Sequence, residues 1–275
     1  MALRINTNVA SVHAQVDLYQ HSRKLVRTLG RLSSGLRINT PADDPAGLAM
    51  AENLQTTSRS INQASRNTND ALSVIQTSDG ASNSVGDLLK RMRELALASS
   101  SGTMDATERA MAQSDSTEMF DEIKRIASET KFHDIKLTDG TVTNMDIQVG
   151  VDGGSTSRIN IKLGDLSATA LSLTTANTDI SSTTAAAASV SILDSAIDSV
   201  NSYRSKYGSS ENRLSSALQG LQNYQSAVTV AESNIRDADF AYETAQMTKL
   251  QIMQQSAISI LAQANSLGGS ALSLL

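Results

Sequence analysis

Histidine is the side chain of this sequence best suited to acid–base or metal chemistry at neutral pH, since the chain has no cysteine. His13 and His21 lie eight residues apart, so a helix could loosely bring them to one face, but they do not form the HExxH pair of helical zinc proteases. The phosphate-binding patterns GxxxxGKS/T and GxGxxG and the GxSxG nucleophile elbow are missing too. We therefore interpret His13, His21 and His133 as polar surface residues and expect no catalytic, cofactor-binding or metal site.

Adjacent carboxylates at Asp43 and Asp44 are the other candidate for acid–base chemistry. Aspartate is also a preferred residue at a helix N-cap, where its charge interacts well with the helix dipole. Pro45 follows directly, and proline is favoured at the first position of a helix. We therefore predict that this pair begins a helix and does not act as a catalytic dyad.

The composition excludes two kinds of partner. The formal net charge is −5 and no dense run of Lys or Arg occurs, so we expect no nucleic-acid binding. No run of about 18 apolar residues is present, so we expect no membrane span. The first residues also lack the basic and apolar regions of a cleaved signal peptide.

Apolar residues at steps of three and four predict long helices near both ends and on either side of the middle. The second helix is expected to begin at Asp44 and to end near Gly102, and Asp105 with Glu108 has the spacing of a capping box for a third helix to about Glu129. Two alternating stretches, MDIQV and SRINIKL, flank a DGG turn and predict a β-hairpin. Residues 173–189, rich in Ser, Thr and Ala, are predicted to be an exposed connection.

The two terminal helices each carry two offset apolar rows. A helix in an ordinary bundle needs only one apolar stripe, so a second stripe requires a second partner. The predicted fold is mainly α: a long antiparallel bundle or coiled-coil rod of N- and C-terminal helices, with a small β-hairpin region in the middle. Copies of the same chain could cover the remaining stripes, and a repeated contact that does not close produces a helical filament.

Several long stretches resemble the bacterial flagellins. These are RLSSGLRINTPADDPAGLAMAE, QASRNTNDALSVIQTSDGA and LLKRMRELALASSSGT in the first half, and the whole C-terminal stretch from ESNIRDADFAYETAQ to LGGSALSLL. The opening MALRINTN fits as well, and the resemblance covers residues 1–164 and 186–275. It implies a non-enzymatic structural subunit of the flagellar filament, a hollow helical propeller for swimming.

The resemblance also implies an organisation and a set of partners. Residues 1–44 and 234–275 would form the inner core of the filament, and residues 45–178 and 179–233 the surrounding shell, without large outer domains. The partners would be further copies of the chain, the flagellar export apparatus, an export chaperone, and the cap and hook-junction proteins. The protein would be extracellular in the flagellum, exported without a cleaved signal peptide.

Two groups of residues carry these expectations. The apolar residues expected to mediate polymerisation in the core are Ile5, Val9, Val12, Val16, Leu250, Met253, Ile260, Leu261, Leu267, Leu274 and Leu275. In some flagellins an animal innate immune receptor binds the shell helix that bears RELA, and by position Arg91 and Leu95 match that motif. Asp115 stands where the family usually has Glu. The alternatives to a filament subunit are a hook–filament junction protein and a secreted coiled-coil binding protein.

Overall fold

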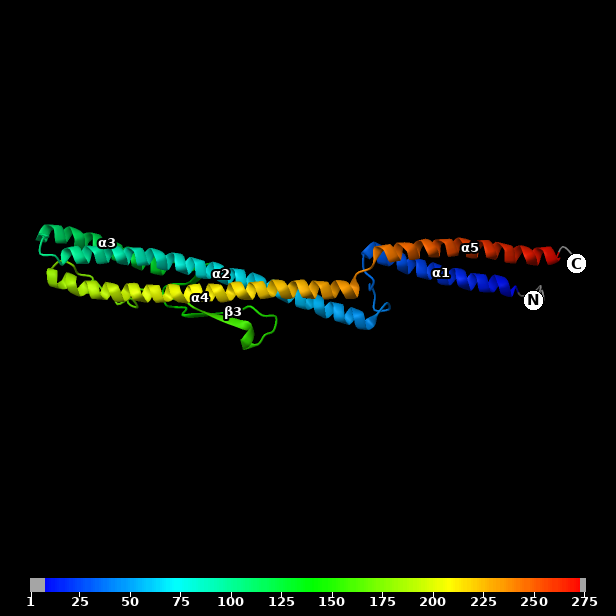
Figure 1. Ribbon diagram of the computed structural model, residues 1–275, viewed down its shortest axis with the longest axis horizontal. Helices are drawn as coiled ribbons and strands as arrows, with labels where there is room; N and C mark the ends of the chain where they lie inside the picture. The colour runs from blue at the N-terminus through cyan, green and yellow to red at the C-terminus, as the bar shows by residue number, and fades with distance from the viewer. Residues whose placement is uncertain (1–7, 273–275) are drawn as a thin grey trace. The chain divides into compact units, whose positions relative to one another are not determined.

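The computed structural model describes residues 8–272, and their side chains as far as Ser266. The elements in chain order are α1 (Val9–Ser34), α2 (Pro45–Ser99), α3 (Ala106–Glu129), β1 (Lys131–Phe132), β2 (Ile135–Lys136), β3 (Asn144–Gln148), η1 (Ser155–Ser157), β4 (Arg158–Lys162), α4 (Thr183–Arg236) and α5 (Phe240–Leu272) (Figure 1). The long helices and the two small antiparallel sheets confirm the predicted, mainly α fold class.

The local signals that begin α2 and α3 act as predicted. Asp44 Oδ1 accepts hydrogen bonds from the backbone N–H groups of Ala46 and Gly47, at 3.1 and 3.0 Å, and so caps the start of α2. Asp105 and Glu108 form both hydrogen bonds of a capping box at the start of α3. Helix α1 ends at Gly35, which has φ 72°, a left-handed conformation that favours glycine.

The chain divides into two compact units. One, the terminal unit, comprises the residues up to Ser58 and those from Ser226 onwards; the other, the central unit, comprises Arg59–Gln225. The long helices α2 and α4 each contribute residues to both units.

The central unit has two apolar clusters. In the first, α2, α3 and α4 pack through side chains that include the fully buried Leu89, Met92, Ile123 and Leu193. In the second, the β3–β4 hairpin, paired from Asn144↔Lys162 to Gln148↔Arg158, packs on α2 and α4. The Tyr207 hydroxyl on α4 accepts a hydrogen bond of 2.8 Å from the Gly164 N–H, which anchors the chain just after β4.

One expectation about the middle of the chain is wrong. Residues 173–189 are not simply an exposed connection, because α4 already begins at Thr183 and Ala186 is fully buried. Leu173 and Ile180 also pack into the first apolar cluster. Ala186 is small, and a search for large apolar residues overlooks such a buried position.

Candidate self-assembly surface

Helices α1 and α5 form an antiparallel pair in the terminal unit, the terminal hairpin (Figure 1). Asn8 Nδ2 at the start of α1 donates a 2.8 Å hydrogen bond to the carbonyl of Ala264, near the end of α5. On α1 the buried residues are Ser11, Ala14 and Thr28, and on α5 they are Glu243, Leu250, Ala257 and Ala264. On α5 these residues lie seven apart, the period of a two-helix seam. This seam covers only one narrow side of each helix.

Large apolar side chains remain exposed outside this seam. On α1, Val12 is 53% exposed and Tyr19 65% exposed, and on α5 Ile260 is 55% exposed. The other exposed large apolar side chains of the two helices are Val9, Val16, Val26, Leu29, Phe240, Tyr242, Ile252 and Ile258. An apolar surface distributed over two long helices is typical of a protein–protein contact and costs free energy in water.

The predicted polymerisation residues differ in their exposure. Val9, Val12, Val16 and Ile260 are exposed, whereas Leu250 is buried in the seam. Met253 and Leu261 are half-buried. Ile5, Leu274, Leu275 and the side chain of Leu267 lie outside the described residues.

Part of the exposed apolar surface was not predicted from the sequence. Phe240, Tyr242 and Ile252 are not among the predicted polymerisation residues, yet each is more than half exposed. The available signal was that α5 carries apolar residues on nearly every side, and such a helix is expected to be surrounded by protein.

A polar node joins the terminal hairpin to the two segments that connect it to α2 and α4. Residues 35–44 and 237–239 are these connectors, and Leu36 and Asp237 pair as an isolated β-bridge. The Arg37 N–H donates to the Arg236 carbonyl at 2.6 Å, and Arg37 Nη2 donates to the Ile235 carbonyl, also at 2.6 Å. Arg37 thus satisfies free carbonyls at the C-terminal end of α4.

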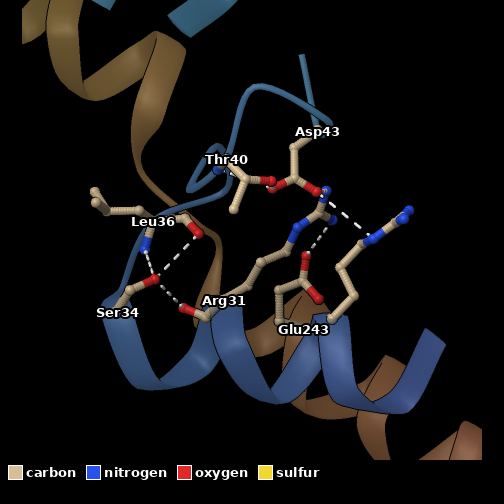
Figure 2. Close-up of polar contacts among 7 residues, drawn as sticks. Arg31, Ser34, Leu36, Thr40, Asp43 and Glu243 are labelled. Atoms are coloured by element: carbon tan, nitrogen blue, oxygen red, sulfur yellow. Dashed lines mark hydrogen bonds and ion pairs between the residues drawn. The ribbon is translucent and has the colours of Figure 1, made fainter. Parts of the chain in front are cut away.

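Charged side chains lie at the centre of this node (Figure 2). Arg31 Nη1 on α1 donates to Glu243 Oε1 on α5 at 3.1 Å, and Arg31 Nη2 lies 3.8 Å from Asp43 Oδ1. Thr40 donates to Asp43 Oδ2 twice, from its N–H at 3.2 Å and from its hydroxyl at 3.0 Å. Asp43 therefore has a different role from the capping Asp44, which the adjacent pair in the sequence did not indicate.

The hydrogen bonds around Asp43 change its pKa. Burial alone would raise the pKa of this carboxyl, but the Thr40 hydroxyl, the backbone N–H groups of Thr40 and Asn39, and the charge of Arg31 together hold it below the usual value. A lowered pKa in the folded state means that the ionised group stabilises the fold above its unfolded pKa. That stabilisation is lost as the pH falls through the folded pKa.

The residues matched to the receptor motif lie on the central unit. Arg91 on α2 is exposed and pairs with Glu94, with 2.7 Å between Nη1 and Oε2. Leu95 is half-buried against the first apolar cluster, and Asp115 on α3 is exposed.

The described part of the chain contains neither a cluster of metal-ligating side chains nor a membrane-spanning helix. Within residues 8–272, His, Cys, Asp and Glu side chains nowhere gather in threes in a way that could hold a metal ion. None of the helices described there is both long and apolar enough to span a bilayer.

Known proteins match this chain over both its N-terminal and its C-terminal part. Residues 5–143 match the family model described as the bacterial flagellin N-terminal helical region, and residues 190–275 match the C-terminal helical region. A flagellin of Halalkalibacterium halodurans is 37% identical over 95% of both chains. The flagellar filament core protein flaB2 of Brachyspira hyodysenteriae is 34% identical over 98% of this chain and 99% of its own.

This chain is also similar to solved structures of flagellar proteins. The crystal structure of Bacillus cereus flagellin is 31% identical with a TM-score of 0.50, covering 57% of this chain and 88% of that one. A putative flagellar hook-associated protein from Vibrio parahaemolyticus has a TM-score of 0.61 at 16% identity, covering 71% of this chain and all of that one, a likeness of fold alone.

The long helices and the exposed apolar side chains of the terminal hairpin are typical of a structural protein that binds other chains. The chain belongs to the bacterial flagellins. It is accordingly a subunit of the extracellular flagellar filament that associates with copies of itself, and the findings do not favour the alternatives of a junction protein or a secreted binder.

Proposed function

We propose that the exposed apolar faces of α1 and α5 are the surfaces by which one subunit binds its neighbours in the filament. The observation that carries this proposal is the exposure of Val9, Val12, Val16 and Ile260, on both helices of the terminal hairpin. Complete burial of one such side chain contributes about 1.5–3 kcal/mol. Several of them, repeated in every subunit, supply a large driving force for polymerisation.

The same reasoning supports the division of the filament into an inner core and an outer shell, which the family resemblance implies. Residues 1–44 and 234–275 would form the inner tube, and residues 45–178 with 179–233 the shell around it. The small residues of the seam favour this arrangement, because they keep α1 and α5 close and leave their other faces free for neighbours. Met253 and Leu261, half-buried at the edge of the seam, would contact both the partner helix and a neighbouring subunit.

Export and assembly partners complete the proposal. A hairpin with so narrow a buried seam gains much of its stability only on assembly, so its folding would be coupled to polymerisation. A weakly folded end suits passage through the flagellar export apparatus with an export chaperone, without a cleaved signal peptide. The cap and hook-junction proteins would then receive the exported subunit.

Hydroxyl-radical footprinting tests the proposed surface. Tyr19, 65% exposed in one subunit, is expected to be oxidised several-fold more slowly in filaments than in depolymerised protein, because a neighbour covers it. Tyr207, 1% exposed, serves as the internal control and is expected to be protected in both. Equal oxidation of Tyr19 in the two states would rule out burial of this face by neighbours.

We further propose that Arg91, Leu95 and Asp115 contribute to recognition by an animal innate immune receptor. Arg91 and Asp115 are exposed charges that a partner could reach in a free subunit. Asp115 is one methylene shorter than the Glu usual at that position, so Asp115→Glu is expected to strengthen receptor activation by monomers, and Arg91→Ala to weaken it. A cell-based receptor reporter assay measures both effects. Unchanged receptor activation by both variants would show that these residues do not contribute to receptor binding.

A further inference from the structure

We propose that Asp152 is a site of spontaneous covalent modification, at which the bond between Asp152 and Gly153 rearranges to an isoaspartyl bond. The chain has three Asp-Gly pairs, at residues 79–80, 139–140 and 152–153. Glycine has no side chain that shields its backbone nitrogen, so this nitrogen can approach the preceding aspartate carboxyl closely. The three pairs have different surroundings in the fold, and only the third meets the requirements of the reaction.

The rearrangement needs no reactant other than water. The backbone nitrogen of Gly153 attacks Cγ of the protonated Asp152 carboxyl, an N–Cγ bond forms, and the amide proton and the carboxyl hydroxyl leave as one water molecule. The product is a cyclic imide, a succinimide. Water then adds back to either ring carbonyl. Cleavage of the N–Cγ bond restores aspartate, whereas cleavage of the bond between the nitrogen and the original main-chain carbonyl carbon gives isoaspartate, which has the same mass.

The pair at residues 79–80 is held by helix α2. Both residues lie inside this helix, where the Gly80 N–H donates to a carbonyl one turn earlier. The Asp79 carboxylate is also bound, because Arg204 Nε on α4 donates to Asp79 Oδ1 at 2.9 Å. The nitrogen and the carboxyl of this pair therefore cannot approach each other unless α2 unwinds.

The pair at residues 139–140 is held by the aspartate side chain itself. Asp139 Oδ1 accepts hydrogen bonds from the Thr141 hydroxyl at 2.6 Å and from the Thr141 N–H at 3.0 Å, and the side chain is only 17% exposed. These bonds hold the pKa of Asp139 below its usual value, which lowers the amount of the protonated carboxyl that reacts. Gly140 has a structural role here, because its φ of 81° is left-handed and a side chain would collide with Asp165.

The pair at residues 152–153 has none of these restraints. Both residues are exposed in the segment between β3 and β4, and within the part of the chain that the structure describes neither the Asp152 carboxylate nor the Gly153 N–H has a hydrogen-bond partner. A Cβ added to Gly153 would meet no atom within 4 Å, so the two reacting groups have room to rotate. Gln148 Nε2 donates to the Asp152 carbonyl at 2.6 Å, which favours the negative charge that develops on this peptide group as its nitrogen loses the proton.

The rearranged product is compatible with the fold. Isoaspartate lengthens the main chain by one bond, because the chain then runs through Cβ. The β3–β4 ladder ends at the pair Gln148↔Arg158, so the added bond lies outside the paired strands. The hairpin also packs on the helices through side chains outside this turn, among them Ile159 and Ile161. We therefore expect a modified subunit to remain folded and the modification to accumulate as the protein ages.

Incubation of the depolymerised full chain at neutral pH tests the proposal. Trypsin releases residues 137–158 as one peptide that contains both Asp139 and Asp152, and residues 67–90 as a peptide that contains Asp79. Electron-transfer dissociation mass spectrometry locates isoaspartate in each peptide, and an isoaspartyl methyltransferase with labelled S-adenosylmethionine measures the total. Isoaspartate is expected to form at Asp152 at least about tenfold faster than at Asp139, where two hydrogen bonds must break first. At Asp79 we expect none while α2 stays folded.

A synthetic peptide of residues 137–158 is the reference, because it contains both pairs without the fold. In this peptide the rates at Asp139 and Asp152 are expected to be similar. In the full chain, Thr141→Ala is expected to speed the reaction at Asp139 several-fold and to leave Asp152 unchanged, since it removes the hydroxyl donor. Gly153→Ala, which has room for its Cβ, is expected to slow the reaction at Asp152 several-fold. Equal rates at Asp139 and Asp152 in the full chain, or no isoaspartate at Asp152, would overturn the proposal.

Discussion

Replacement of Ile260 by aspartate is expected to abolish filament formation while the central unit keeps its helices. Ile260 is 55% exposed on α5 and makes no part of the seam with α1, so a single subunit tolerates a charge there. In a filament, by contrast, every subunit would have to bury an unpaired carboxylate in an apolar contact. Burial of one such ion costs several kcal/mol. This cost is larger than the free energy that burial of the isoleucine side chain contributes to the contact, and that contribution is lost as well.

Seeded polymerisation followed by light scattering measures this effect, with circular dichroism of the monomer as the check on folding. Thr175→Asp is the control, since it adds the same charge at an exposed position in the segment before α4 of the central unit. Normal polymerisation of Ile260→Asp would show that α5 does not present this face to a neighbour.

Removal of residues 1–44 and 234–275 is the second change with a large expected effect. It takes away all of α1 and α5 and with them the whole terminal hairpin. Both apolar clusters, including Leu89, Ile123 and Ile161, lie between Arg59 and Gln225 and remain intact. The trimmed chain is therefore expected to stay helical and monomeric.

Much of the fold was predictable from local chemistry. Apolar spacing indicated the long helices, and the caps at Asp44 and Asp105 marked where α2 and α3 begin. These signals act within a few residues, so they can be recognised from residues that are close in the sequence. The same holds for the β3–β4 hairpin, which alternation and a DGG stretch predicted.

The connector node was not predictable in the same way. Arg31 and Glu243 meet only because α1 and α5 pair in one particular register, and Arg37 reaches α4 across a comparable sequence separation. In the sequence, Asp43 and Asp44 look alike, yet one binds arginines and Thr40 and the other caps a helix. Only the path of the connector separates the two roles.

The assembly surface was predicted in outline but not residue by residue. Apolar spacing indicated that α1 and α5 each need two partners, but it could not tell which row faces the other helix. Leu250 faces the seam, whereas Ile260 remains exposed, although both were predicted to mediate polymerisation. Small residues decide the outcome, because Ala257 and Ala264 allow the close approach that places larger side chains outside.

Electron microscopy of the full and trimmed chains after seeding is the most direct test that subunits assemble through their terminal helices. The full chain, depolymerised by mild heat or acid and returned to neutral pH, is expected to form long hollow filaments. The chain without residues 1–44 and 234–275 is expected to form none, although circular dichroism shows folded helices. Filaments of normal length from the trimmed chain, or a full chain that seeds cannot recruit, would contradict this account.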